Sequence, residues 1–229
     1  MEQIFCFSHA GGTASFYDEL EKNLPDFEVV KLEYAGHGKR HKEPNYKNFQ
    51  ELTDDLYAQI RQKRNNESFY LFGYSMGGIA VVEILKKMTE FPEHIFIASC
   101  SPRTRADLAE LSDENEINNW IVNRVIHHGA VPKDLEELFW RMYFPLYRQD
   151  YELIRQYRFE EIKREIPATI MYSESDISSE EIKGWESYFE CRYHKFDGGH
   201  FFIKEHYDEV AYIVREIMES NEKIKKTNI

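Results

Sequence analysis

Short apolar segments alternate with segments of helical periodicity along most of this 229-residue chain, and that alternation restricts its fold more than any other feature. The expected strands are residues 3–8, 28–33, 68–73, 95–100, 168–173 and 191–196. Several are apolar almost throughout, as is typical of strands buried on both faces of a sheet. The expected helices are residues 15–24, 47–64, 76–90, 179–188 and 201–219. The pattern predicts one α/β domain, residues 1–229, with a doubly wound, mostly parallel, twisted sheet flanked by helices.

Residues 105–165 interrupt this alternation, because they separate two expected strands by far more chain than one helix requires. The insertion contains three helical patterns, at 113–127, 134–144 and 149–159. Pro132 and Pro145 are expected to separate them, since proline cannot continue a helix. An insertion of this size over a compact sheet is often a lid or a substrate-binding subdomain. We therefore expect a helical lid, and the alternative is an additional structural layer packed on the sheet.

Charge and hydropathy argue against nucleic-acid binding and against a membrane-spanning helix. The formal net charge of −12 disfavours general nucleic-acid binding, which needs cations to neutralise phosphates. No apolar run reaches the roughly 18 residues that a membrane-spanning helix needs. Residues 1–8 lack the basic and apolar regions of a signal peptide, and the three cysteines are widely spaced and odd in number. These features predict a cytoplasmic protein with free thiols.

The segment Gly73-Tyr74-Ser75-Met76-Gly77 follows an expected strand and precedes an expected helix. This arrangement matches the nucleophile elbow, a sharp turn that exposes a serine hydroxyl above the edge of a sheet. Glycine is needed at 73 and 77 because a Cβ atom there would clash with neighbouring backbone. The helix dipole beyond Ser75 favours developing negative charge. A phosphate-binding turn is the alternative interpretation, but the lysine of a phosphate loop is absent.

A serine hydroxyl is a weak nucleophile until a base accepts its proton, and that base in turn needs a carboxylate partner. His200 follows the last expected strand, in a loop whose two glycines allow a close approach to the elbow, and a surface or helix-capping histidine is the alternative. Asp176 comes directly after another strand, which gives the chain order Ser, Asp, His of the nucleophile-elbow fold. Glu174 is the competing carboxylate. We expect Ser75, Asp176 and His200 to be catalytic.

The tetrahedral intermediate of acyl transfer needs two backbone amides for its oxyanion. The expected donors are the N–H of Met76, which follows the nucleophile, and the N–H of Ala10, in the glycine-containing loop after the first strand. His9 in the same loop is a candidate metal ligand or base. No other His, Cys or Asp has metal-ligand spacing to it, so packing under the loop is favoured and no metal site is predicted.

Several segments together resemble one enzyme family. They are Ser8-His9-Ala10-Gly11-Gly12, residues 34–40 followed by Glu43-Pro44, residues 73–78, Asp176 followed by Trp185, and residues 198–202. The set resembles the type II (external, editing) thioesterases of nonribosomal peptide and polyketide synthetases, in the α/β-hydrolase superfamily, and the medium-chain fatty-acid thioesterases are similar. The resemblance covers nearly the whole chain and includes residues 144–151, which are similar to a Leu-Arg-Ala-Asp segment of the family. Ser8 stands where proline is usual, and His37 where arginine is common.

The resemblance implies a serine-hydrolase thioesterase that removes acyl groups from the 4′-phosphopantetheine arm of a carrier protein through an acyl-enzyme. Such enzymes clear misprimed or stalled acyl units or release intermediates in nonribosomal peptide and polyketide biosynthesis. The arm arrives with a transient partner, the carrier protein, so no bound cofactor is expected, and a monomer is the default. Three alternatives stay open: an esterase for small free esters, an acyltransferase with the same triad, and a non-catalytic binding module.

Two groups of side chains are expected to contact the carrier protein or the acyl chain. Because carrier proteins of this kind are typically acidic, docking needs local basic residues near the ends of strands. The candidates are Lys39, Arg40, Arg103 and Arg105, with a solvated surface as the favoured alternative. The candidates for an acyl pocket in the lid are Phe139, Trp140, Met142 and Phe144, with a role in the core of the lid as the alternative.

Overall fold

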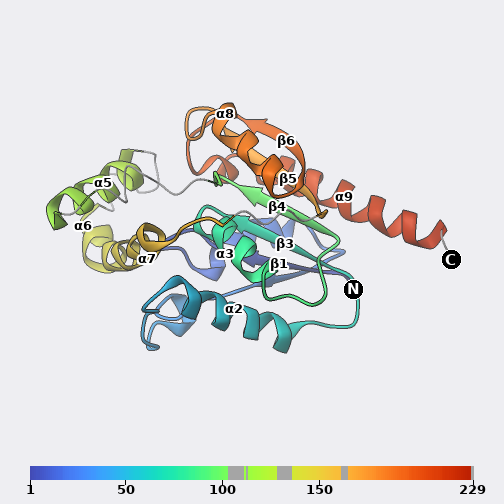
Figure 1. Cartoon of the computed structure of the whole chain (residues 1–229), viewed down its shortest axis with the longest axis horizontal. Coiled ribbons are helices and arrows are strands. Elements are labelled where there is room, and N and C mark those ends of the chain that lie inside the picture. The colour runs from blue at the N-terminus through green and yellow to red at the C-terminus, as the bar shows by residue number, and fades with distance from the viewer. Residues whose placement is uncertain (103–110, 112, 128–135, 161–164, 228–229) are drawn as a thin grey trace.

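The computed structural model describes residues 1–102, 111, 113–127, 136–160 and 165–227 (Figure 1). Its strands are β1 (Gln3–Phe7), β2 (Glu28–Lys31), β3 (Phe69–Tyr74), β4 (His94–Ala98), β5 (Pro167–Ser173) and β6 (Glu190–Phe196). They form one sheet in the order β2-β1-β3-β4-β5-β6, and every neighbouring pair is parallel. The predicted fold class is confirmed. Within the described residues, no helix is long and apolar enough to cross a membrane.

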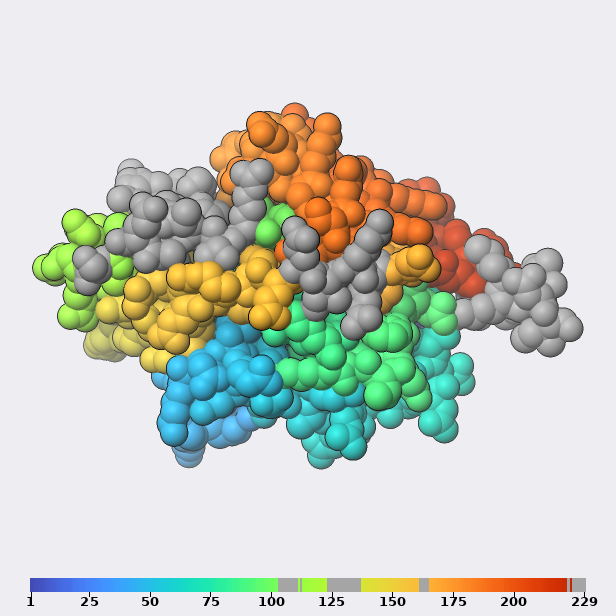
Figure 2. Space-filling view, viewed as in Figure 1, coloured from blue at the N-terminus to red at the C-terminus, as the bar shows by residue number. Residues whose placement is uncertain are grey.

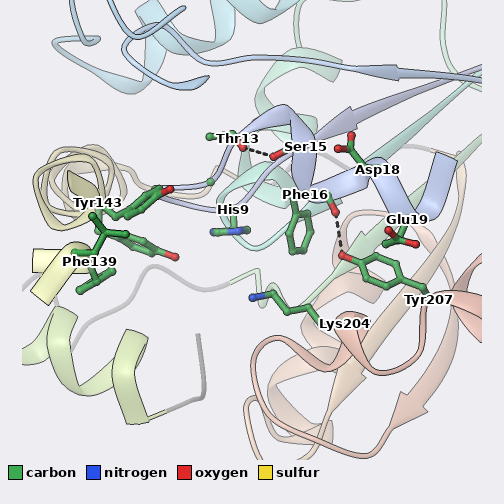
Figure 3. A pocket seen from close by; sticks show the side chains of 14 residues that line it. His9, Thr13, Ser15, Phe16, Asp18, Glu19, Phe139, Tyr143, Lys204 and Tyr207 are labelled. Atoms are coloured by element: carbon green, nitrogen blue, oxygen red, sulfur yellow. Dashed lines mark hydrogen bonds between the residues drawn. The ribbon is translucent and has the colours of Figure 1, made fainter. Parts of the chain in front are cut away.

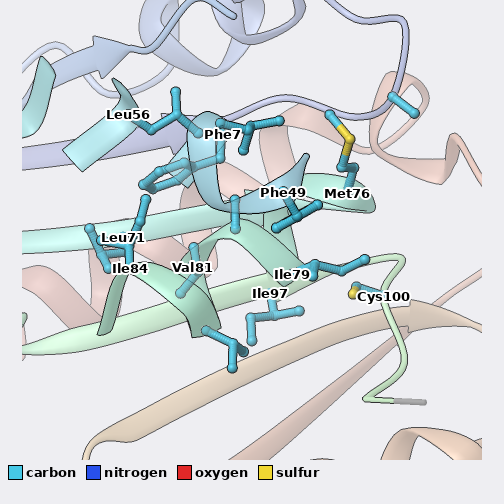
Figure 4. Close-up of a cluster of buried hydrophobic side chains, with 14 of the residues drawn as sticks. Phe7, Phe49, Leu56, Leu71, Met76, Ile79, Val81, Ile84, Ile97 and Cys100 are labelled. Atoms are coloured by element: carbon cyan, nitrogen blue, oxygen red, sulfur yellow. The ribbon is translucent and has the colours of Figure 1, made fainter. Parts of the chain in front are cut away.

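Strand side chains alternate between the two faces of the sheet, and each face has its own hydrophobic core. Phe5 and Phe7 pack on one face with α2 (Phe49–Lys63) and α3 (Met76–Leu85), as Figure 4 shows for the centre of this core. The alternate side chains of β1, Ile4 and Cys6, point to the other face, which α1 (Asp18–Lys22) and α9 (Tyr207–Thr227) cover. Burial on both faces explains why the central strands β1, β3 and β4 are apolar almost throughout, whereas the edge strands β2 and β6 are partly exposed and more polar.

Helix α2 shows how local sequence places an element on this sheet. Its side chains at three- and four-residue spacing, Phe49, Leu52, Leu56 and Ile60, are all buried. Asn48 caps the helix, because its side chain accepts a hydrogen bond from the Glu51 N–H at 2.9 Å. A cap followed by one apolar stripe fixes both where the helix begins and which side faces the sheet.

The chain between β4 and β5 contributes α5 (Glu114–His127), α6 (Glu136–Leu138), the π-helical turn η4 (Phe139–Tyr143) and α7 (Phe144–Gln156). They gather at one end of the molecule, on the left in Figure 1. In the space-filling view, α7 (yellow) lies against the chain at the start of α2 (blue) (Figure 2). There the Gln149 amide donates to the Tyr46 carbonyl at 3.1 Å, and the Phe49 and Tyr157 rings lie 4.8 Å apart.

The prediction that Pro145 separates two helices of this insertion is wrong. Helical backbone continues from residue 136 to residue 156, and Pro145 lies in the first turn of α7. The Phe144 N–H bonds to the Phe139 carbonyl, five residues back, so the chain widens into a π turn just before the proline. Proline is tolerated in a first turn because its missing N–H is not needed there. Pro132 lies outside the described residues.

Helix ends differ from the prediction where loops serve the site. The last helix, α9, begins at Tyr207 rather than near residue 201, because residues 202–204 form the separate 3₁₀ turn η6 (Phe202–Lys204). The helix expected over 179–188 is a short α8 (Ser179–Ile182) that tightens into the 3₁₀ turn η5 (Lys183–Ser187). The ends of elements are decided by tertiary contacts, which sequence periodicity does not record.

Candidate active site

Ser75 lies at the carboxyl end of β3, in the turn that leads directly into α3. Its φ angle of +53° falls in the region that side-chain-bearing residues rarely adopt. A Cβ atom on Gly77 would lie 2.1 Å from the Phe7 carbonyl oxygen, and one on Gly73 would lie 2.5 Å from the Gly77 carbonyl oxygen. No side chain fits at either position, so both glycines are required by the close packing of β1, β3 and α3.

The structure brings His200 and Asp176 to this serine. The His200 Nε2 atom lies 3.0 Å from Ser75 Oγ, and its Nδ1 atom lies 2.7 Å from Asp176 Oδ2. The Asp176 side chain is fully buried. A carboxylate only accepts hydrogen bonds, so Nδ1 carries a proton and the neutral ring presents the lone pair of Nε2 to the hydroxyl. This arrangement can remove the proton from Ser75 as the oxygen attacks an acyl carbon.

Glu174, the competing carboxylate, points elsewhere. Its side chain accepts a hydrogen bond from the Ser179 N–H at 3.1 Å and lies 3.6 Å from Lys195 Nζ. It is exposed, whereas Asp176 turns inward beside the histidine loop. The geometry therefore favours Asp176 as the partner of His200.

Four hydroxyl groups that no sequence motif singles out hold the loop that carries His200. Ser99 Oγ donates to the His200 carbonyl at 2.8 Å, and the Tyr74 hydroxyl donates to the same oxygen. Ser173 and Ser175 both donate to the Gly198 carbonyl. Their only sequence signal is position: each lies at or just beyond the carboxyl end of a strand, where loops of a parallel sheet meet.

The two expected amide donors lie at the start of α3 and in the loop after β1. Met76 is the first residue of α3, so its N–H has no acceptor within the helix. Ala10 lines a small cavity together with Ser75 and His200. Among the described residues, none accepts a hydrogen bond from the Ala10 N–H. The two N–H groups remain the expected donors to an oxygen attached to the carbon that Ser75 attacks.

His9 is buried and packs as an aromatic ring. Its centroid lies 4.7 Å from that of Phe16 and 5.0 Å from that of Phe201, and its Nδ1 atom lies 2.8 Å from the Ala10 carbonyl. Burial lowers the pKa of His9 to about 3, so the ring is neutral at ordinary pH. The part of the chain that the structure describes holds no group of three or more His, Cys, Asp or Glu side chains able to bind a metal.

A larger pocket, of about 620 Å³, opens beside this cavity and shares His9 and Tyr147 with it. Figure 3 shows the Lys204 amino group pointing into it, toward His9. Of the four lid residues expected at an acyl pocket, Phe139 lines this space. Trp140 and Met142 are 42% and 54% exposed. Phe144 packs against Trp140, with ring centroids 4.7 Å apart.

The basic residues expected at a docking surface have different surroundings. The Arg40 guanidinium binds Asp55 at 2.6 Å and also pairs with Glu43, so its hydrogen-bonding edge is occupied. The side chain of Lys39 is exposed. Arg103 and Arg105 lie outside the described residues. Lys204, which no sequence pattern singled out, lines the large pocket.

Residues 2–218 match the family model described as "Thioesterase domain". The chain belongs to this family. This thioesterase-domain chain is 30% identical to the "Probable cadicidin biosynthesis thioesterase" of Streptomyces griseus, over 91% of its own length and 60% of that relative. It is 21% identical to the medium-chain "S-acyl fatty acid synthase thioesterase" of Homo sapiens, over 88% of its own length and 80% of the human protein.

Two solved structures extend the comparison. ClbQ from the colibactin NRPS/PKS pathway matches with a TM-score of 0.84 and 25% identity, over 97% of this chain and 99% of that one. The type II thioesterase BorB from the borrelidin biosynthetic cluster matches with a TM-score of 0.80 and 27% identity, over 94% and 91%. The resemblance to type II thioesterases read from the sequence is thereby confirmed.

Proposed function

We propose that this chain hydrolyses acyl thioesters carried on the 4′-phosphopantetheine arm of a carrier protein. The removed groups would be misprimed or stalled acyl units, or intermediates, of nonribosomal peptide or polyketide biosynthesis. The observation that carries the proposal is the chain of contacts from Ser75 through His200 to the buried Asp176, in a member of the thioesterase domain family. Its similarity to a type II thioesterase along more than nine-tenths of the sequence supports the choice of substrate.

In the first step, Ser75 Oγ attacks the thioester carbon while His200 Nε2 accepts the hydroxyl proton. Asp176 stabilises the resulting imidazolium, and the amides of Met76 and Ala10 bind the oxyanion. His200 then gives its proton to the leaving sulfur, and the carbon–sulfur bond breaks. In the second step, His200 takes a proton from water, the hydroxide attacks the acyl-enzyme, and Ser75 regains its proton as the acid leaves.

The large pocket is the proposed route for the arm. It lies beside the catalytic cavity, with which it shares His9 and Tyr147, and the exposed surface of the lid borders it at Leu138 and Tyr143. Among the described residues that line it, Lys204 alone carries an ammonium or guanidinium group. Lys204 is therefore proposed to receive the phosphate of the arm, in place of Arg40, whose guanidinium is already paired.

The proposal makes no use of a bound cofactor or metal, and it treats the chain as a monomer with a transient carrier partner. Helices α5 to α7 would then act as the lid over the acyl group. A direct test compares three substrates: an acetylated carrier protein, the matching acyl-pantetheine and a p-nitrophenyl ester. Wild type and Ser75→Ala are assayed side by side. Faster turnover of the carrier-bound thioester, abolished by Ser75→Ala, is expected, whereas reaction with free esters alone would favour a general esterase.

A further inference from the structure

A buried pair of side chains joins the lid to the loop that carries Ala10. The His37 Nε2 atom lies 3.0 Å from Asp150 Oδ2, and the same oxygen accepts a hydrogen bond from the Gly11 N–H at 2.6 Å. The side chains of His37 and Asp150 are 1% and 2% exposed. His37 follows β2, Asp150 belongs to α7, and Gly11 follows β1, so one carboxylate connects three separate segments.

The partners of His37 fix its protonation. Its Nδ1 atom lies 3.0 Å from the Ala35 carbonyl, which can only accept, so Nδ1 carries a proton. Its Nε2 atom faces a carboxylate, which also accepts, and the ring is therefore doubly protonated. Burial by itself would lower the pKa of His37, but the hydrogen bond and charge of Asp150 outweigh it, so the pKa lies above its ordinary value. Among the other titratable groups around it, Glu33 raises this pKa further, while His9 and Tyr34 lie close by.

The loop that carries Ala10 is held on both sides of that residue. Before it, the Ser8 carbonyl accepts a hydrogen bond from the Tyr34 hydroxyl at 2.6 Å. After it, the Gly11 N–H binds Asp150. Gly11 has a φ of +69°, and a Cβ atom there would lie 2.3 Å from the Tyr147 ring. The direction of the Ala10 N–H thus depends on the contacts that Ser8 and Gly11 make on either side of it.

We propose that His37 and Asp150 are positioning residues for the reaction: their charged contact keeps the loop, and with it the Ala10 N–H, in the arrangement that an oxyanion requires. The inference rests on the proposed role of that N–H. Without the second proton of His37, the Nε2 lone pair would face the carboxylate in a buried site, leaving Asp150 an unpaired charge apart from its bond to Gly11. A buried charge that loses its partner is strongly destabilised, so the contact would open.

The sign of the pH dependence follows. Because the pKa of His37 is raised in the folded protein, the contact is complete below the ordinary pKa of histidine. It is lost as the pH rises through the raised value. Activity should therefore have an alkaline limb that belongs to the loop rather than to His200, which must be neutral to act as the base.

The test uses labelling of Ser75 by a fluorophosphonate, which needs the serine, its base and the oxyanion donors but no carrier protein. The labelling rate is measured from pH 6 to pH 10 for wild type, His37→Arg and His37→Gln, with melting temperatures as the control for folding. The wild-type rate should fall at alkaline pH. His37→Arg, whose charge persists throughout, should lose that limb. His37→Gln should label about tenfold or more slowly than wild type at pH 6 to 7, and its rate should approach the wild-type rate at alkaline pH.

Two results would overturn the proposal. One is a wild-type rate that stays level or rises up to pH 10, which needs no variant to fold. The other is an alkaline limb that His37→Arg retains unchanged. If the predicted labelling pattern appears while no carrier-bound thioester is hydrolysed, the positioning role stands and the proposed substrate is wrong, so the two proposals fail separately.

Discussion

His200 Nε2 lies 3.0 Å from Ser75 Oγ, although the two residues are 125 positions apart in the chain. Neither residue could reach the other without the intervening strands β4, β5 and β6, which place the histidine loop beside the turn after β3. The contact is therefore a property of the sheet order. Substitutions of the residues around this contact can test their roles one at a time.

The identity of the carboxylate partner can be tested by paired substitutions. Asp176→Asn should lower kcat about 10⁴-fold, because an amide can donate to Nδ1 and so favours the wrong tautomer of His200. Glu174→Gln is the matched control, since Glu174 binds the Ser179 N–H instead, and it should retain nearly full activity. Steady-state kinetics on an acyl-pantetheine measures both. The reverse ranking would reassign the acid to Glu174.

Space at the nucleophile turn can be tested by adding one methyl group. Gly77→Ala places a Cβ atom 2.1 Å from the backbone oxygen of Phe7, which cannot move without shifting β1. We expect a loss of about 1–3 kcal/mol in the free energy of unfolding, or more. In Gly184→Ala, the control, the added atom meets ring carbons of Pro102 at 2.9 and 3.6 Å, so the loss should be smaller. Urea denaturation measures both, and a Gly77→Ala loss below about 0.5 kcal/mol would show that the turn has room.

Acyl-chain preference should depend on Phe139 and not on its exposed neighbour. Phe139 lines the large pocket, so Phe139→Ala enlarges it and should shift the ratio of kcat/KM between long and short acyl chains by about tenfold. Met142, which is 54% exposed, is the matched control, and Met142→Ala should leave the ratio unchanged. The measurement is a series of acyl-pantetheines of increasing length. An unchanged ratio in Phe139→Ala would assign this ring to the core of the lid.

Stability at acid pH should reflect His94, which is buried in β4 and lies 2.8 Å from the Thr169 hydroxyl. Burial lowers its pKa to about 4, so between that value and its ordinary pKa the unfolded chain binds more protons than the folded one. The free energy of unfolding therefore falls as the pH falls through this window, by at most about 3 kcal/mol from His94. His94→Phe should reduce the slope between pH 4.5 and 6.5, measured by urea denaturation. An identical slope would mean that His94 charges freely in the folded protein.

Local sequence located the strands and the residues that the fold brings together around Ser75. The expected strands agree with the six observed strands to within two residues at each end. The central strands are the clearest in the sequence, because burial on both faces demands continuous hydrophobicity. Gly73 and Gly77 predicted a sharp turn at Ser75, because the close packing there leaves no space for a side chain at either position. Ser75, Asp176 and His200 each follow the carboxyl end of a strand, β3, β5 and β6, and that position selected them because the carboxyl ends of parallel strands meet at one edge.

Pairings between distant segments were decided only by the tertiary structure. The sequence predicted Arg40 as a docking residue, but in the folded chain its guanidinium pairs with Glu43 and Asp55. Lys204 lines the large pocket instead. It marked His37 only as a departure from the family pattern, whereas the structure buries it against Asp150, 113 residues away. Periodicity and motifs record which residues are apolar, small or reactive. Which charge meets which depends on how loops from different strands converge, and no local pattern encodes that.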